Sequence, residues 1–144
     1  MKHRRSIMTC CVLCIVIAAV GSCSKDADKD LTSDAVKVAE SWLEAVDKGE
    51  YGKSWEQSAE LFKAAVSRAE WEKSLNSIRP PLGELVSRSV RSAKFATSLP
   101  GAPDGEYVVI QFTSVFANKE SAIETVTPMK DTDGTWRVSG YYIK

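Results

Sequence analysis

The spacing of the apolar residues changes once along this chain, close to Gly83. Before that point apolar side chains recur every three or four residues, which is typical of amphipathic helices. After it they fall in short runs rich in valine, isoleucine, threonine and aromatic residues, which is typical of strands. Helices first and strands afterwards predict an α+β fold, with the helices packed on one face of a curved antiparallel sheet.

Three helices are expected before Gly83. Their start signals lie at Ser33 or Asp34, at Ser54 and at Ser67. Lys48-Gly49 ends the first helix, and Pro80-Pro81 ends the third. The sequences SxxQ at residue 54 and SxxE at residue 67 have the spacing of a capping box, which satisfies backbone N–H groups at a helix start. Trp42, Trp55 and Trp71 fall on the apolar faces. Aromatic residues at such positions usually form the core, and lining a ligand cavity is the alternative.

Four antiparallel strands are expected after Gly83, over residues 86–97, 106–116, 122–129 and 135–143. A rigid turn rich in proline and glycine at residues 100–105 and a hairpin loop at residues 131–134 connect them. Asp131 and Asp133 faintly resemble the start of a calcium-binding loop. The bidentate glutamate that such a loop needs does not follow, so a hairpin turn is favoured.

The first 22 residues have the pattern of a lipoprotein signal peptide. Lys2, Arg4 and Arg5 precede an apolar run, residues 7–20, that is too short to span a bilayer comfortably. The sequence Val-Gly-Ser-Cys at residues 20–23 resembles the bacterial lipobox, in which the cysteine, here Cys23, is acylated and becomes the first residue of the mature chain. Ordinary secretory cleavage nearby and an uncleaved anchor are the alternatives.

We therefore expect a lipid anchor at Cys23, because two or three acyl chains hold a protein firmly to a membrane. Ser24 stands where an inner-membrane lipoprotein usually has aspartate, so the periplasmic face of the outer membrane is the expected location. Residues 23–32 are polar and charged and are expected to form a lipidated flexible tether. Residues 33–144 are expected to form a single domain.

Removal of residues 1–22 narrows the chemistry available to the mature chain. Three of the four cysteines are lost with this segment, Cys10, Cys11 and Cys14, and so is the only histidine, His3. With Cys23 acylated, no disulfide, Cys/His zinc site, Ser-His-Asp triad or Cys-His pair can form, and no cofactor is expected. The mature chain keeps 16 basic and 19 acidic residues, a net charge of about −3. This balance argues against a nucleic-acid partner.

Six strings along the domain follow one recognisable pattern. They are AESWL at 39–43, YGKSW at 51–55, RPPLG at 79–83, LPGAPDGEYVV at 99–109, ETVT at 124–127 and WRVSGYYI at 136–143. Together they resemble the bacterial domain-of-unknown-function family 4019 over about residues 35–143. The resemblance implies a cone-shaped α+β fold similar to the cystatin-like and nuclear transport factor 2-like folds. It implies no activity and no catalytic residues, since a fold alone does not define a function.

Three kinds of function are open. The first is a non-catalytic envelope module that binds a small apolar ligand, a peptide or an envelope protein between sheet and helices. Its candidate pocket residues are Trp42, Trp55, Arg88, Glu124 and Tyr141. The second is an enzyme of the cone-fold isomerase or dehydratase type, which would use buried carboxylates and tyrosines. The third is a purely structural role in envelope assembly.

The environment of Glu124 distinguishes the enzyme hypothesis from the non-catalytic ones. It lies in a strand otherwise rich in apolar residues and threonines, with Arg88 and Arg91 on an earlier strand as candidate partners. The favoured interpretation is a solvated or edge-strand glutamate, because charges are seldom buried unpaired. Arg79 ends a predicted helix, where its charge complements the helix dipole, and anion binding at the mouth of the cone is the alternative.

The last strand carries two tyrosines in succession, Tyr141 and Tyr142, which must point to opposite faces of the sheet. One is expected to pack inward and the other to border water or a partner. An exposed face carrying Tyr107, Val109 and Val115 predicts a homodimer formed through the sheet.

Overall fold

A computed structural model describes residues 23–144 of the protein, with side chains from residue 30 onward. Its helices are α1 (Cys23–Asp47), α2 (Tyr51–Glu56), α3 (Glu60–Ala65), α4 (Arg68–Ile78) and the 3₁₀ helix η1 (Pro80–Leu82). Its strands are β1 (Leu85–Ala96), β2 (Tyr107–Phe116), β3 (Lys119–Lys130) and β4 (Trp136–Ile143). The predicted α+β class with a four-stranded antiparallel sheet is confirmed. The predicted signal peptide lies outside the described residues.

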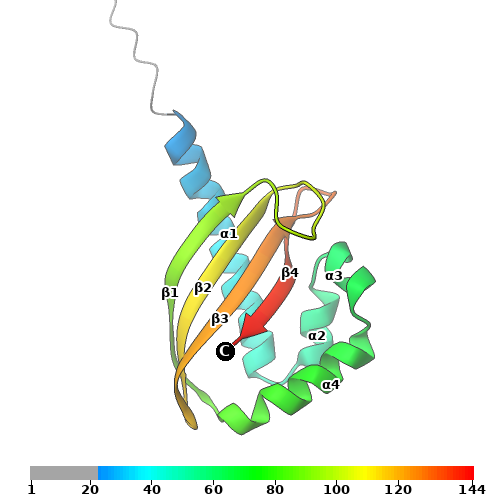
Figure 1. The fold of residues 1–144 in the computed structure, drawn as a ribbon, viewed down its shortest axis with the longest axis vertical. Helices are drawn as coiled ribbons and strands as arrows, with labels where there is room; N and C mark the ends of the chain where they lie inside the picture. The colour runs from blue at the N-terminus through cyan, green and yellow to red at the C-terminus, as the bar shows by residue number, and fades with distance from the viewer. Residues whose placement is uncertain (1–22) are drawn as a thin grey trace, which may run out of the picture.

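The strands pair in chain order, β1-β2-β3-β4, and every pair is antiparallel. Register shifts interrupt all three pairings, two of them within β1, between Leu85 and Ser87 and between Val90 and Ser92. Such irregularities bend a strand and increase its twist. Figure 1 shows the curved sheet, with α1 crossing one face and α2, α3 and α4 beside β4. Among the described residues no helix is both long and apolar enough to cross a membrane.

Helix α1 is longer than predicted. Residues 23–32, expected to be a flexible tether, are helical, so the helix begins at Cys23 rather than at Ser33 or Asp34. The segment contains no glycine or proline that would stop a helix. Once the buried part of α1 is in place, adding further turns at its N-terminal end costs little, because the nucleus has already formed.

The predicted second helix is in fact two helices, α2 and α3, and the predicted capping box at Ser54 is wrong. Ser54 lies inside α2, where its hydroxyl donates to the carbonyl of Tyr51 at 2.8 Å. The chain breaks between the helices because the N–H of Ala59 donates to the carbonyl of Val138 in β4, at 2.8 Å. The capping box at Ser67 is confirmed at the start of α4.

Aromatic side chains occupy the space between the helices and the sheet. The Trp42 ring lies 5.8 Å from Trp71 and 5.5 Å from Tyr141, centroid to centroid. Phe62 meets Trp71 edge to face at 5.1 Å. Trp42 and Trp71 are 3% and 7% exposed, which confirms that both are core residues. Their indole N–H groups are satisfied by Ser54 and Ser58.

The two faces of the sheet differ as expected at β4, where Tyr141 packs inward and Tyr142 is exposed. The predicted outer patch is wrong in one residue. Tyr107 is buried, because its hydroxyl donates to the carbonyl of Pro103 at 2.7 Å and the β1–β2 loop covers its ring. Val109 and Val115 are half-buried.

The turn between β3 and β4 is the predicted hairpin loop. Gly134 has a φ of 78° and donates to the carbonyl of Asp131. The Asp133 carboxylate accepts from the N–H of Thr135 and, through both oxygens, from Arg137. The two aspartates are therefore held by the turn and by Arg137, and no group of acidic or metal-binding side chains in the described residues has the arrangement of a metal site.

Candidate functional site

Four charged side chains from four parts of the chain meet where α1 and α4 end against the sheet. They are Asp47 at the end of α1, Arg79 after α4, Arg88 in β1 and Glu124 in β3. Each guanidinium contacts both carboxylates, so the four charges alternate around a ring and cancel. We call this arrangement the charge ring. The side chains of Glu124 and Arg79 are 0% and 7% exposed, and those of Arg88 and Asp47 are 11% and 18% exposed.

Every acceptor position of Glu124 is occupied. Its Oε1 accepts from Arg79 Nη1 at 3.0 Å and from the Tyr141 hydroxyl at 2.8 Å. Its Oε2 accepts from Arg88 Nε at 2.7 Å and from Ser114 Oγ at 2.5 Å. A carboxylate has about four lone-pair positions. The interpretation of Glu124 as a solvated strand residue is therefore wrong, because two buried guanidinium groups compensate its charge.

Asp47 joins the same two arginines from the other side. Its two oxygens accept from Arg88 Nη1 at 2.7 Å and from Arg88 Nη2 at 2.9 Å, a bidentate pair of the strong kind. Arg79 Nη2 also donates to Asp47 Oδ1. Asp47 is not among the site residues predicted from the sequence. An acidic residue in the last turn of a helix opposes the helix dipole, and that anomaly was the available signal of a tertiary partner.

Arg79 was expected to cap a helix or to bind an external anion. It is the C-cap residue of α4, but its guanidinium points into the protein and binds the protein's own carboxylates. The guanidinium also lies 4.7 Å from the centroid of the Phe116 ring, a cation–π contact. Of the two arginines predicted to pair with Glu124, Arg88 does so and Arg91 is exposed at a register shift of β1.

The charge ring determines the protonation state of its member Arg88 and of Tyr141, which donates to Glu124. Burial works against the charged form of Arg88, but the hydrogen bonds that it donates to Asp47 and Glu124, together with their negative charges, outweigh burial and hold the pKa of Arg88 above its ordinary value. Burial, followed by the negative charge of Glu124, raises the pKa of Tyr141 well above that of a free tyrosine. At neutral pH Arg88 is therefore charged and Tyr141 is a neutral hydrogen-bond donor.

The structure brings together some of the predicted pocket residues and not others. Arg88, Glu124 and Tyr141 belong to one hydrogen-bonded cluster, and Trp42 packs against the Tyr141 ring. Trp55 is half-buried and donates instead to the carbonyl of Val66, at 2.7 Å. Cys23 is the first residue of α1, and its side chain lies outside the described part of the structure.

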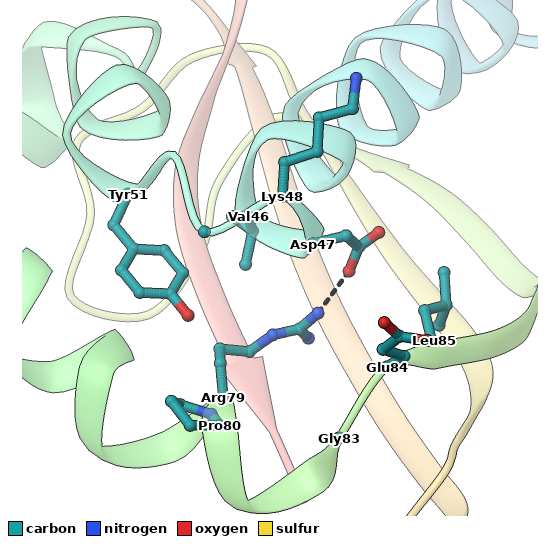
Figure 2. Close-up of a pocket in the computed structure, with 10 residues that line it drawn as sticks. Val46, Asp47, Lys48, Tyr51, Arg79, Pro80, Gly83, Glu84 and Leu85 are labelled. Carbon is teal, nitrogen blue, oxygen red and sulfur yellow. Dashed lines mark hydrogen bonds and ion pairs between the residues drawn. The ribbon is translucent and has the colours of Figure 1, made fainter.

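A pocket of about 240 Å³ opens beside the charge ring. Asp47 and Arg79 line it, together with Tyr51, Pro80 and Glu84. Figure 2 shows the Tyr51 ring on one side of Arg79 and the carboxylates of Asp47 and Glu84 on the other. The residues predicted to line a pocket, Trp42, Trp55, Arg88, Glu124 and Tyr141, do not line this one. Its walls come from the ends of α1 and α4 and the starts of α2 and β1, whose meeting no local pattern indicates.

The comparison with protein families agrees with the pattern of motifs. No curated protein is similar enough to match. The family described as "Protein of unknown function (DUF4019)" matches residues 38–141, which run from α1 to β4 and include every member of the charge ring. The chain therefore belongs to the DUF4019 family of proteins of unknown function.

Proposed function

We propose that this protein is a lipid-anchored module of the bacterial cell envelope that binds a ligand or partner without catalysing a reaction. The observation that carries the proposal is the saturation of Glu124. A general acid or base must reach the proton that it transfers. Glu124 has no exposed surface, and two arginines, a serine and a tyrosine occupy its oxygens.

The charge ring then acts as a scaffold. It joins the C-terminal ends of α1 and α4 to β1 and β3, and so sets the shape of the pocket beside it. The aromatic packing of Trp42, Trp71 and Tyr141 favours ligand contact at this pocket over contact in the interior. The curvature of the sheet supports the cone-like fold that the family resemblance implies.

The anchor belongs to the same proposal. We place lipid on Cys23, at the first residue of α1, with the domain on the periplasmic face of the outer membrane. The start of α1 projects beyond the sheet in Figure 1. Leu31 is partly buried against the core, so at 1.5 Å per residue the helix would hold the domain roughly 12 Å from the acylated cysteine.

The proposed homodimer would use the outer face of the sheet, which the helices leave uncovered. The half-buried side chains of Val109 and Val115 and the exposed ring of Tyr142 support it. Such an interface would bury two equivalent faces against each other.

The stability of a Glu124→Gln variant of the full chain tests the central claim. Removing the charge of a catalytic acid commonly leaves stability unchanged or raises it. Removing the charge of a scaffold acid leaves two buried arginines short of a counter-ion and lowers stability. We expect a marked loss in chemical denaturation. A variant as stable as the parent chain would contradict the scaffold and return Glu124 to the list of candidate catalytic acids.

A further inference from the structure

The pocket beside the charge ring contains hydrogen-bonding groups that the protein itself leaves unused. Tyr51 is only 9% exposed, yet its hydroxyl takes part in no hydrogen bond with the described residues. No fully buried polar side-chain atom in residues 30–144 lacks a partner, so this hydroxyl keeps some accessible surface, and Tyr51 lines the pocket. Figure 2 shows it directed into that space. A ligand acceptor in the pocket would receive a hydrogen bond that the described residues leave unused.

Arg79 supplies a second unused donor. Its Nη1 donates to Glu124 and Tyr141, and its Nη2 donates to Asp47. Its Nε takes part in no hydrogen bond with the described residues. By the same reasoning this N–H keeps some accessible surface, and Arg79 lines the pocket. Tyr51 and Arg79 thus offer two donors, one of them charged, to an incoming anionic group.

The opposite side of the pocket offers acceptors. Glu84 is exposed and forms no ion pair with the described side chains. Asp47 Oδ2 accepts a single hydrogen bond, from Arg88 Nη1, and keeps a free lone pair. In Figure 2 both carboxylates lie across Arg79 from Tyr51, and Lys48 extends away from them. Lys48 Nζ is directed toward Glu44 on α1, 3.8 Å from its Oε2.

We propose that this pocket binds a small zwitterion, an α-amino acid with an aliphatic side chain. The ligand carboxylate accepts hydrogen bonds from the Tyr51 hydroxyl and Arg79 Nε, and the ligand ammonium donates to Glu84 and Asp47. The charged residues that line the pocket are Asp47, Lys48, Arg79 and Glu84, two of each sign. A ligand with one net charge therefore gains on one side and loses on the other. A zwitterion gains on both sides.

The size and the walls of the pocket agree with such a ligand. Its volume of about 240 Å³ lies below the range typical of drug-sized ligands. Val46, Pro80 and Leu85 provide apolar surface for a short aliphatic side chain. The assignment rests on the proposed binding function and names the ligand class for it.

Titration of the full chain with L-valine, followed by amide chemical shifts in NMR, tests the assignment. The matched ligands are N-acetyl-valine, which lacks the ammonium, and valinamide, which lacks the carboxylate. We expect saturable binding of valine and an affinity at least about tenfold weaker for either blocked compound. Absence of saturation with valine, or equal affinity for all three compounds, would overturn the proposal.

Two variants locate the site. Tyr51→Phe removes only the hydroxyl, and Glu84→Gln removes only the charge. Each is expected to weaken valine binding about tenfold while the fold is kept. Tyr142→Phe and Glu40→Gln, at exposed positions elsewhere, are the controls and should bind as the parent chain does. Unchanged binding in Tyr51→Phe and Glu84→Gln would exclude this pocket.

The result of the valine titration can be separated from the result of the Glu124→Gln stability test. If Glu124→Gln is destabilised as expected but valine does not bind, the binding module stands and the ligand class is wrong. If Glu124→Gln keeps its stability, the scaffold interpretation fails whatever the valine titration shows.

Discussion

Arg88 Nε donates to Glu124 Oε2 at 2.7 Å, although the two residues lie on strands that are not neighbours in the sheet. Strand β2 runs between them, and Arg88 pairs in register with Ser114 of β2. Ser114 is fully buried, and its short side chain lets the guanidinium pass over β2 while its hydroxyl also donates to Glu124. The charge ring therefore depends on a small residue at the centre of the sheet.

Neutralising Glu124 should destabilise the fold. The variant Glu124→Gln keeps the shape of the side chain but leaves Arg79 and Arg88 with one carboxylate between them, and breaking a buried ion pair typically costs about 3–5 kcal/mol. The free energy of unfolding from urea denaturation measures the loss. Glu120→Gln, at an exposed position of the same strand, is the control and should change stability by less than about 0.5 kcal/mol.

The losses of stability caused by substituting Arg88 and Glu124 should not be additive, because the two side chains form one ion pair. In a double-mutant cycle, Arg88→Met and Glu124→Gln together are expected to cost less than the sum of the single variants. The second substitution removes a charge that the first has already left unpaired. Directly contacting residues couple by about 0.5–3 kcal/mol. Strict additivity of the two single values would show that the 2.7 Å contact contributes nothing to stability.

Tyr141 should make the domain sensitive to alkali. Burial and then the charge of Glu124 raise its pKa in the folded state, so the folded protein holds a proton that the unfolded chain releases above pH about 10. The stability from this group is complete below that pH and falls by up to about 1.4 kcal/mol for each further pH unit.

Chemical denaturation between pH about 9 and 11 tests this, because the range spans the ordinary pKa of tyrosine. Tyr141→Phe should lose less stability across the range than the parent chain. Tyr142→Phe, which alters the exposed neighbour, should keep the parent slope. Identical slopes in all three chains would show that Tyr141 does not titrate differently on folding.

Local signals predicted much of the fold. The capping box at Ser67, the Pro-Pro stop after α4 and the apolar run of β2 are predicted from neighbouring residues. The break between α2 and α3 was not predicted, because it is imposed by the hydrogen bond from the Ala59 N–H to the carbonyl of Val138, far along the chain. Local periodicity continues across that break, and only the tertiary contact interrupts it.

The candidate site shows the same limit. Sequence alone selected Glu124 and Arg88 as partners, but it favoured an exposed Glu124 because the pairing depends on the register of three strands. The pocket was missed because its walls come from four elements whose ends meet only in the folded chain. Of the four groups that bond Glu124, only Arg88 was predicted as its partner, and the bonds from Arg79, Ser114 and Tyr141 depend on the folded chain.

The buried tryptophans should dominate stability. Trp42→Ala and Trp71→Ala each remove a large side chain from the core and are expected to cost about 3–5 kcal/mol, a large share of the stability of a small domain. Trp55→Ala is the matched control, and its half-buried ring should cost clearly less. Urea denaturation of the three variants decides this. Parent-like stability in the Trp42 or Trp71 variant would contradict the core described above.

The lipid anchor should depend on Cys23 alone. It is the cysteine of the chain that follows Val-Gly-Ser, so Cys23→Ala should abolish both acylation and cleavage of the signal peptide. Metabolic labelling with a radioactive fatty acid, followed by gel analysis, reports the lipid and the change in mass together. Cys14→Ala, within the apolar run, is the control and should still be labelled and processed. Label retained by the Cys23→Ala chain would place the lipid elsewhere, whereas cleavage without label would indicate ordinary secretion.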